Sequence, residues 1–365
     1  MGPFDTNLVI AIVLTTTPIL FAGIGELVAE RAGVIDIGLE GMMLNGAFFG
    51  FWAAHASGNL LLGVVVGMLA GTVLGVVMAA LSVSARADQI VVGIGITILA
   101  TGATTFANEE LFTSGGNQPT ISPMSNLAIP GLDHIPVIGK ALFDQVPLAY
   151  VAYLMVPVVW YVLFRTNLGL LIRGAGEYPD AVETSGTSVV AIRWGATLFA
   201  SSMAGLGGVM LSVGNLGLFN EGMSGGRGYI ALAAVIFGRW RPLGVLCASL
   251  IFGGADALQL RLQAFSSIPD QVWIALLLIP VLVLAYQLIQ QRRLPTKVRP
   301  PGFGTAVFAF GVVLVIVSPH WSVPAEFWLM LPYVITLVVL GGVAGKVRLP
   351  AALGLPYRRA ASGDA

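Results

Sequence analysis

Charged residues are scarce in this sequence. Asp, Glu, Lys and Arg together make up 10% of its 365 residues, whereas 56% are hydrophobic. Soluble domains carry roughly 25% charged residues, so this chain cannot cover itself with a wetted surface. The composition therefore predicts an integral membrane protein that is partnered by the lipid bilayer. The formal net charge of +0 gives no indication of a nucleic-acid partner.

Residues that form disulfides or hold metals are also few. The single cysteine, Cys247, excludes an internal disulfide and a cysteine-based metal framework. The histidines, His55, His134 and His320, are far apart in the chain, and no H-E-x-x-H pattern occurs. We therefore expect neither a bound metal nor a catalytic site.

A motif for nucleotide hydrolysis is missing as well. The pattern G-x-x-x-x-G-K-[ST] does not occur, because Gly139-Lys140 and Gly345-Lys346 lack the upstream Gly and the following Ser or Thr. We expect no directly bound cofactor. If the protein moves a solute with energy from ATP, a partner subunit has to hydrolyse it.

Long apolar runs dominate what is present. Runs of about 20 residues cross a bilayer as helices, whereas barrel strands alternate over about 10 residues. The sequence therefore predicts an all-α, polytopic bundle of about eleven transmembrane spans. These spans are 7–29, 37–55, 59–82, 90–107, 147–164, 192–213, 228–239, 243–262, 271–290, 304–319 and 327–345. The span 228–239 is short, so it begins earlier, is tilted, or is a half-helix.

The distribution of Lys and Arg predicts the orientation. With the N-terminus outside and the C-terminus inside, fifteen basic residues fall on the inner side and only Lys140, Arg227 and Arg261 on the outer side. The polar segment 165–193 then faces the cytoplasm.

The chain divides into three regions by its loops and motifs. We expect core helices over 1–267, an extra pair of spans over 268–322 with a basic, Pro-rich cytoplasmic linker at 290–304, and a terminal span with a cytoplasmic tail over 323–365. Similar Pro-Trp motifs begin at Ile268 and Val323, and they leave open either a duplication or a common way of starting a span. The segment 109–146 is predicted to be an external loop with a short surface helix.

Several polar side chains fall within or beside apolar spans. Polar groups at membrane depth tend to face the bundle interior or a solute path. The candidates for a substrate path are Asn45, Thr97, Thr101, Asn215, Asp256 and Gln259. The alternative for each is a hydrogen bond that joins two helices. The acids between Glu26 and Glu40 lie near the predicted inner interface, where snorkelling and ion pairing with Arg31 explain them most simply.

Within 165–193 we predict a turn at Gly174 and Gly176, followed by a short helix over 180–184 that Gly186 ends. Pro179 suits the first turn of that helix, and Asp180 favours its positive end. Such a helix could fit a groove on a nucleotide-binding domain, although an ordinary cytoplasmic loop would have the same pattern.

Two motifs resemble the permeases of ATP-binding-cassette (ABC) importers in the branched-chain amino acid and simple-sugar superfamily. GEYPDAVETSG, residues 176–186, is similar to the nucleoside-type pattern G-E-N-P-x-A-A-E-x-A-G, with Tyr178 in place of Asn. ERAGVIDIGLEGMM, residues 30–43, is similar to E-R-x-G-V-x-N-I-G-x-E-G-M-M, with Asp36 in place of Asn. The ending PAALGLPY, residues 350–357, also looks like that family's, and the resemblance covers about residues 5–267 and 323–357.

The resemblance implies a passive transport subunit in a bacterial plasma membrane. Members of this family work with an ABC ATPase, a second permease that forms a heterodimer, and an extracellular or periplasmic binding protein. Nucleosides are the implied substrate, with simple sugars or branched-chain amino acids as alternatives; an ATP-independent carrier is a further one. The residues implied in coupling to the ATPase are Gly176, Glu177, Tyr178, Pro179, Asp180, Ala181, Glu183 and Gly186.

Overall fold

The computed structural model describes residues 6–112, 119–131, 138–263 and 349–357. The chain forms two compact units, of which one comprises Met1–Val9 and Ala255–Gly345 and the other, here called the main unit, comprises Ile10–Gly254 and Lys346–Ala365. The predicted spans 271–290, 304–319 and 327–345, the linker 290–304, the repeated Pro-Trp motifs and the boundary at 267 lie outside the described residues. The site considered below lies within the main unit.

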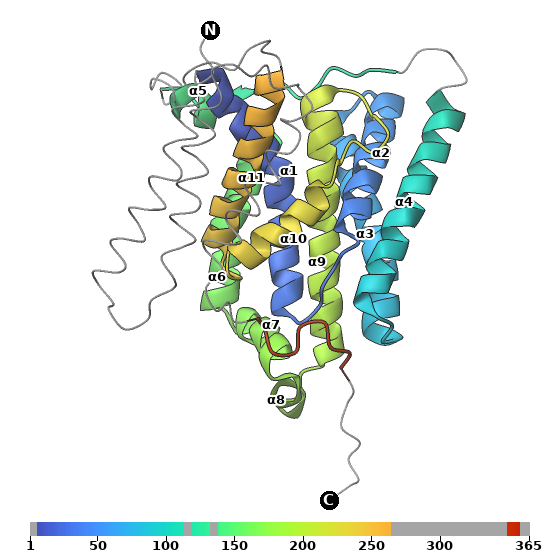
Figure 1. Ribbon diagram of the computed structural model, residues 1–365, viewed down its shortest axis with the longest axis vertical. Helices are drawn as coiled ribbons and strands as arrows, with labels where there is room; N and C mark the ends of the chain where they lie inside the picture. The colour runs from blue at the N-terminus through green and yellow to red at the C-terminus, as the bar shows by residue number, and fades with distance from the viewer. Residues whose placement is uncertain (1–5, 113–118, 132–137, 264–348, 358–365) are drawn as a thin grey trace, which may run out of the picture. The chain divides into compact units, whose positions relative to one another are not determined.

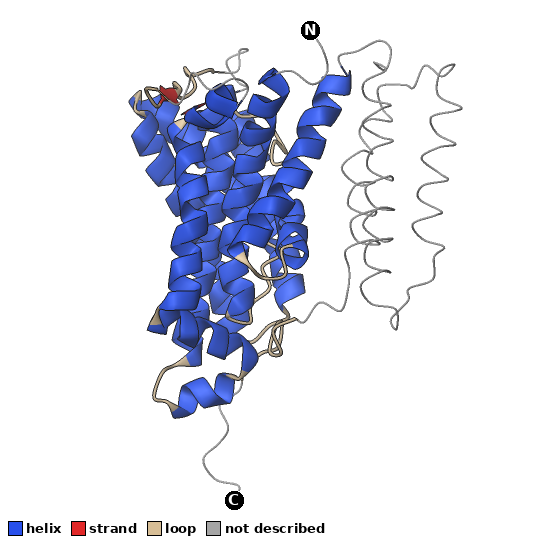
Figure 2. Ribbon diagram, turned by 90° about the vertical axis from the view of Figure 1, so that its left-hand side faces the viewer, coloured by secondary structure: helices blue, strands red, loops and turns tan. Residues whose placement is uncertain are grey.

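Helices make up most of the described chain (Figures 1 and 2), so the prediction of a helical fold is confirmed. They are α1 (Thr6–Arg31), α2 (Leu39–Ser57), α3 (Leu60–Met78), α4 (Gln89–Phe112), α5 (Ile138–Phe143), α6 (Pro147–Arg165), α7 (Asn167–Glu177), α8 (Pro179–Thr184), α9 (Val189–Val209), α10 (Arg227–Phe237) and α11 (Pro242–Gln263). Two π-helical turns, η1 (Ala79–Ser84) and η3 (Met210–Leu216), extend α3 and α9. The short strands β1 (Leu127–Ala128) and β2 (Asp144–Gln145) pair antiparallel.

Six helices in the described part of the chain are long and apolar enough to cross a membrane. They occupy Asn7–Arg31, Leu60–Ser84, Gln89–Phe112, Pro147–Arg165, Val189–Leu216 and Pro242–Arg261. By contrast, the 11 residues of α10 extend about 16 Å at 1.5 Å per residue, roughly half of a 30 Å hydrocarbon core. For 228–239 the structure therefore shows a helix of about half the crossing length, and it runs obliquely in Figure 1. The small helix predicted within the loop 109–146 is found as α5.

Glycine on α3 brings its backbone against that of α9, the close approach that small residues permit between helices. A side chain added at Gly71 would come within 2.7 Å of the Ser201 carbonyl oxygen, and one added at Gly205 within 2.7 Å of the Gly67 carbonyl oxygen. Lipid tails are as apolar as the helix surfaces, so no hydrophobic effect drives two helices together in a bilayer. Close approach of the backbones supplies van der Waals packing energy instead. The helix α9 and its extension η3 are the most buried of the candidate spans, and 83% of the apolar window is buried.

The main unit has two distinct ends (Figure 1). The helices α7 and α8, the last turn of α1, the first turn of α9 and the segment 349–357 gather at one end, here called the coupling end. Helix α5 lies at the opposite end (Figure 1), as do the strands β1 and β2, drawn in red in Figure 2.

Candidate functional site

The first half of the polar segment 165–193 is helical, so the turn predicted at Gly174 and Gly176 is wrong. Both glycines lie inside α7, whose N-terminus is capped where the Gly169 N–H donates to Thr166 Oγ1 at 3.2 Å. Gly176 is required for a different reason, because any side chain there would collide with the backbone carbonyl of Arg31. The glycine therefore joins the end of α7 closely to the end of α1.

The short helix predicted over 180–184 is present as α8, one residue longer at its start. Pro179 occupies the first turn, and Gly186 follows the last turn with φ +87°. This left-handed conformation is easily adopted by glycine and satisfies the carbonyls at the helix end: the Gly186 N–H donates to the Glu183 carbonyl at 3.0 Å. The sequence signal for this helix was therefore its start and stop residues.

Two contacts hold α8 against the rest of the main unit. The backbone N–H of Val189, in the first turn of α9, donates to Glu183 Oε2 at 3.1 Å. A carboxylate is favourable at that positive helix end. Val182 is buried in a small apolar cluster with Ala175 of α7 and Val189. A displacement of α8 would therefore act directly on α7 and α9.

The other face of the motif is open to solvent. Tyr178 is 67% exposed, and Asp180, Ala181 and Gly186 are also exposed. The motif 176–186 thus separates into residues that position α8 and residues that are available to a partner.

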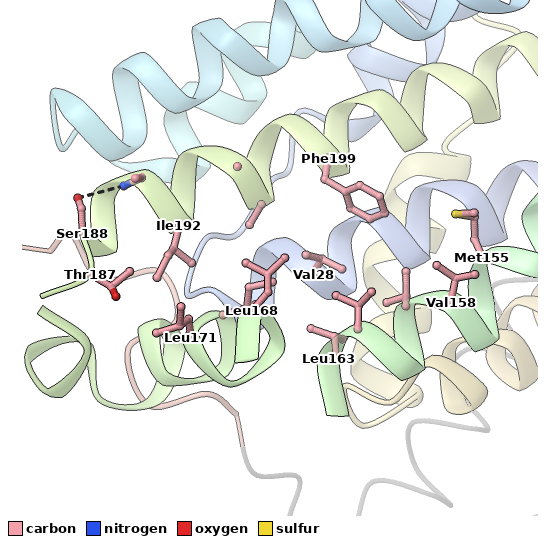
Figure 3. A pocket seen from close by; sticks show the side chains of 16 residues that line it. Val28, Met155, Val158, Leu163, Leu168, Leu171, Thr187, Ser188, Ile192 and Phe199 are labelled. Carbon is pink, nitrogen blue, oxygen red and sulfur yellow. Dashed lines mark hydrogen bonds between the residues drawn. The ribbon is translucent and has the colours of Figure 1, made fainter. Parts of the chain in front are cut away.

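An apolar cavity of about 470 Å³ lies beside this segment, between α1, α6, α7 and α9 (Figure 3). Its walls include Val28, Leu163, Leu171 and Phe199, and hydroxyl groups enter only with Thr187 and Ser188. Sites for polar solutes place several polar groups around the ligand. This cavity is therefore a poor site for a sugar or nucleoside, but it leaves space beside the apolar side of α7.

The acids that follow Glu26 in sequence are buried inside the main unit, so their assignment to snorkelling and ion pairing at the interface is wrong. Glu26 and Asp36 are both 0% exposed. The Asp36 N–H donates to Glu26 Oε1 at 2.9 Å, and the Gly38 N–H donates to Asp36 Oδ1 at 2.9 Å. Glu30 accepts the indole N–H of Trp240. These acids anchor the turn between α1 and α2 and the turn before α11.

The burial of Asp36 also affects the hydrogen bonding and the pKa of its carboxyl group. Within the described chain its Oδ2 atom makes no hydrogen bond. Burial raises the pKa of Asp36 to about 7, against an ordinary 3.8, although the hydrogen bond from Gly38 acts in the opposite direction.

Glu40 fixes the half-helix α10. Its Oε1 accepts the Gly226 N–H and its Oε2 accepts the Gly228 N–H, both at 2.8 Å. A carboxylate that accepts two N–H groups at a helix N-terminus is a strong, charge-assisted arrangement. The loop before α10 descends from the far end of the main unit, so α10 begins near mid-height (Figure 1). Arg227, which was predicted to lie on the outer side, belongs to this start of α10.

The predicted substrate-path residues lie on several different helices and in two units, and their place on a solute path stays a prediction. Asn45 donates from α2 to the Ala70 carbonyl of α3 at 2.8 Å, which is the helix-joining alternative. Thr97 and Thr101 donate to carbonyls of their own helix, α4. Asn215 lies in η3. Asp256 and Gln259 lie on the last turns of α11, in the smaller unit.

Sequence reasoning missed Arg193, which was treated only as the end of the polar segment. It lies in the second turn of α9 and is 2% exposed. The available signal was an arginine at the start of a long apolar run, close to a Gly-containing polar segment. Its burial could not be read from the sequence.

Comparisons with known proteins identify the family of this chain. Residues 8–286 match the family described as the permease component of branched-chain amino acid transport systems. The chain is 42% identical over 267 residues to a putative glucose ABC transporter permease protein of Haloferax volcanii, covering 72% of this chain and 80% of that protein. No solved structure matches it.

Two further relatives match over almost the whole chain. A guanosine ABC transporter permease protein of Bacillus subtilis is 30% identical over 354 residues, covering 95% of each chain. A nucleoside ABC transporter permease protein of Lactococcus lactis subsp. cremoris is 31% identical over 350 residues, covering 94% of this chain and 93% of that protein. With its long apolar helices, this chain is a multi-pass membrane protein. It belongs to the family of branched-chain amino acid transport system permease components, and it is a transport subunit whose ATPase is a separate protein.

Proposed function

We propose that this chain is the membrane-spanning permease of an ATP-driven importer of nucleosides, and that α8 is the element on which its partner ATPase docks. The observation that carries the docking role is the division of α8 into two faces. Glu183 and Val182 fix one face to α9 and α7. Asp180 and Ala181 on α8 are exposed, as is Tyr178 immediately before the helix, which is 67% exposed.

The mechanism follows from how α8 is held. Closure of the ATPase around ATP pushes on the exposed face of α8. Because α8 contacts the N-terminus of α9, and α7 packs against the end of α1 at Gly176, the push reaches two transmembrane helices. The bundle then alternates between outward and inward openings. The apolar cavity beside α7 gives that helix room to move.

Nucleosides are favoured as substrates by the extent of the matches. The guanosine and nucleoside permeases align with 94–95% of this chain, whereas the putative glucose permease, although more similar, aligns with 72%. Simple sugars are the second candidate because of that higher identity. Branched-chain amino acids, or transport without ATP, are the remaining alternatives.

The proposal includes a topology and a set of partners. In this topology the protein has about eleven spans, with the N-terminus outside and both the coupling end and the C-terminus in the cytoplasm of a bacterial cell. The chain is divided into the core helices 1–267, an extra pair of spans over 268–322, and the terminal span and tail over 323–365. A second permease forms a heterodimer with this chain, and an extracellular or periplasmic binding protein delivers the substrate. The charge bias of the loops supports the orientation.

The docking role is tested by changing the exposed end of α8. Gly186 and Gly58 both have positive φ, +87° and +67°, and a side chain at either meets nothing within 4 Å. Replacement by Trp therefore carries a similar backbone cost at both positions, roughly 1–2 kcal/mol. Gly58 ends α2 at the opposite end of the main unit. We expect Gly186→Trp to remove co-purification of the ATPase and ATP-dependent uptake, and Gly58→Trp to retain the ATPase.

A second variant tests the contact that holds α8. Glu183→Lys places a positive charge at the positive N-terminus of α9, and we expect it to abolish uptake while the protein remains in the membrane. Normal ATPase binding and uptake in both Gly186→Trp and Glu183→Lys would eliminate the docking role.

The substrate is tested separately, by uptake of labelled guanosine in competition with glucose and leucine. Competition by glucose but not by other nucleosides would favour the sugar alternative.

A further inference from the structure

Arg193 joins three segments that are far apart in the sequence. Its Nε donates to the Ala32 carbonyl oxygen at 3.1 Å, just beyond α1. Its Nη2 lies 3.5 Å from the Ala175 carbonyl oxygen near the end of α7. On the third side, Nη1 donates to Leu355 at 2.7 Å and Nη2 to Ala352 at 3.4 Å. All the recorded acceptors of this buried side chain are backbone carbonyls.

The position of these carbonyls explains why a buried cation is stable there. The last carbonyl groups of a helix have no partner within the helix and carry a partial negative charge. Ala32 follows the last residue of α1, and Ala175 lies in the last turn of α7. One guanidinium therefore caps two helix ends at once, using the fixed fork of donors that lysine does not have.

The segment 349–357, here called the strap, completes this arrangement. The Ala352 N–H donates to the Gly176 carbonyl at 2.8 Å, and the Gly354 N–H donates to the Gly33 carbonyl at 3.2 Å. The strap thus bonds to the end of α7 and to the turn after α1, the same two places that Arg193 contacts. Figure 1 shows it crossing the coupling end beside α7.

We infer that Arg193 and the strap form a clamp that makes α7, the end of α1 and the start of α9 move as one body during coupling. Arg193 acts as a positioning residue for transport. This inference rests on the proposed docking of the ATPase on α8. Without the clamp, α8 would still present the exposed face that includes Tyr178, but its displacement would be absorbed at the loosened helix ends. Hydrolysis of ATP would then continue with little import.

The measured quantity is the number of nucleoside molecules imported per ATP hydrolysed. The permease is reconstituted in proteoliposomes together with the second permease, the ATPase and the binding protein. We expect Arg193→Gln to bind an amount of ATPase within about twofold of the wild type, and to lower the number of molecules imported per ATP at least tenfold. Arg193→Lys keeps the charge but loses the fork, so its ratio should be intermediate. A chain that ends at residue 348 lacks the strap, and its ratio of imported molecules to hydrolysed ATP should also be lower than that of the wild type. Arg86→Gln, which changes an exposed arginine, is the matched control and should leave the ratio unchanged.

A purely structural role for Arg193 would give a different result. The amount of assembled transporter would fall, but each assembled transporter would import as many molecules per ATP as the wild type, and that outcome would overturn the inference. If Arg193→Gln does not assemble, Arg193→Lys and the shortened chain decide the question by the same ratio. If Gly186→Trp and Glu183→Lys both retain ATPase binding and uptake, the docking role itself fails. Loss of binding in Gly186→Trp with a normal ratio in the Arg193 variants would remove only the clamp.

Discussion

Asp36 offers a quantitative test of how the turn between α1 and α2 is held. The carboxyl group is 0% exposed, and its Oδ1 accepts the Gly38 N–H at 2.9 Å. Asn at this position, as in the family pattern that the segment resembles, would keep that acceptor oxygen. Its NH₂ group would replace Oδ2, which has no partner within the described chain. We therefore expect Asp36→Asn to fold and to remove one titrating group from the interior.

The sign and size of the effect follow from the pKa. The pKa of Asp36 is raised to about 7 from an ordinary 3.8, so the folded protein binds this proton more tightly than the unfolded chain does. The contribution of Asp36 to the free energy of unfolding is then unaffected below about pH 4, falls as the pH rises to about 7, and is constant above that. At 1.36 kcal/mol for each pH unit, the full loss is about 4 kcal/mol, and roughly 3 kcal/mol of it falls between pH 5 and pH 8.

The assay compares the wild type with Asp36→Asn in detergent at pH 5 and pH 8. The wild type should lose apparent melting temperature between these pH values, and Asp36→Asn should lose less and be the more stable protein at pH 8. Glu26 of α1 accepts the Asp36 N–H and Glu30 lies one helical turn further along α1, so Glu26→Gln and Glu30→Gln are measured in parallel. An unchanged pH dependence in Asp36→Asn, or its loss in Glu26→Gln alone, would refute the assignment to Asp36.

Two further predictions concern packing and helix ends. Glu40→Ala leaves the Gly226 and Gly228 N–H groups without the carboxylate that accepts them at 2.8 Å. Since hydrogen bonds to charged groups contribute about 1.5–3 kcal/mol each, we expect a clear fall in apparent melting temperature and in uptake, with Glu40→Gln intermediate. A wild-type melting temperature in Glu40→Ala would contradict this account of α10. Gly71→Leu should prevent α3 from packing against α9, because a side chain there meets the backbone of α9, whereas Gly95→Leu should be tolerated, because nothing lies within 4 Å of a side chain added there. The two variants are compared by their yields of folded protein in size-exclusion chromatography. Equal yields would contradict the close α3–α9 contact.

The features that the sequence predicted well depend on length and local chemistry. Apolar runs of sufficient length gave the long helices. The helix α8 was predicted because Pro179 at its start and Gly186 after its end act locally, within a few residues. Such signals do not depend on which distant segment lies nearby.

Gly176 shows why the rest of the coupling segment was misread. A glycine is compatible with a turn and with a close contact between helices. Only the neighbour decides between these roles, and that neighbour is the carbonyl of Arg31, about 145 positions away in the chain. The same limit applies to Asn45, whose amide could serve a solute path or a neighbouring helix until the Ala70 carbonyl is seen beside it.

The acids between Glu26 and Glu40 raise the more general point. Charged residues between two apolar runs are usually assigned to the membrane surface, because a charge at membrane depth is costly. Here they replace missing backbone partners: Glu26 accepts the Asp36 N–H in the turn between α1 and α2, and Glu40 accepts two N–H groups at the start of α10. A turn or a half-helix inside a membrane protein exposes backbone N–H groups that water cannot reach. Buried acids are therefore to be expected where helices begin inside the bundle, and the half-length of α10 was the sequence feature that could have indicated this for Glu40.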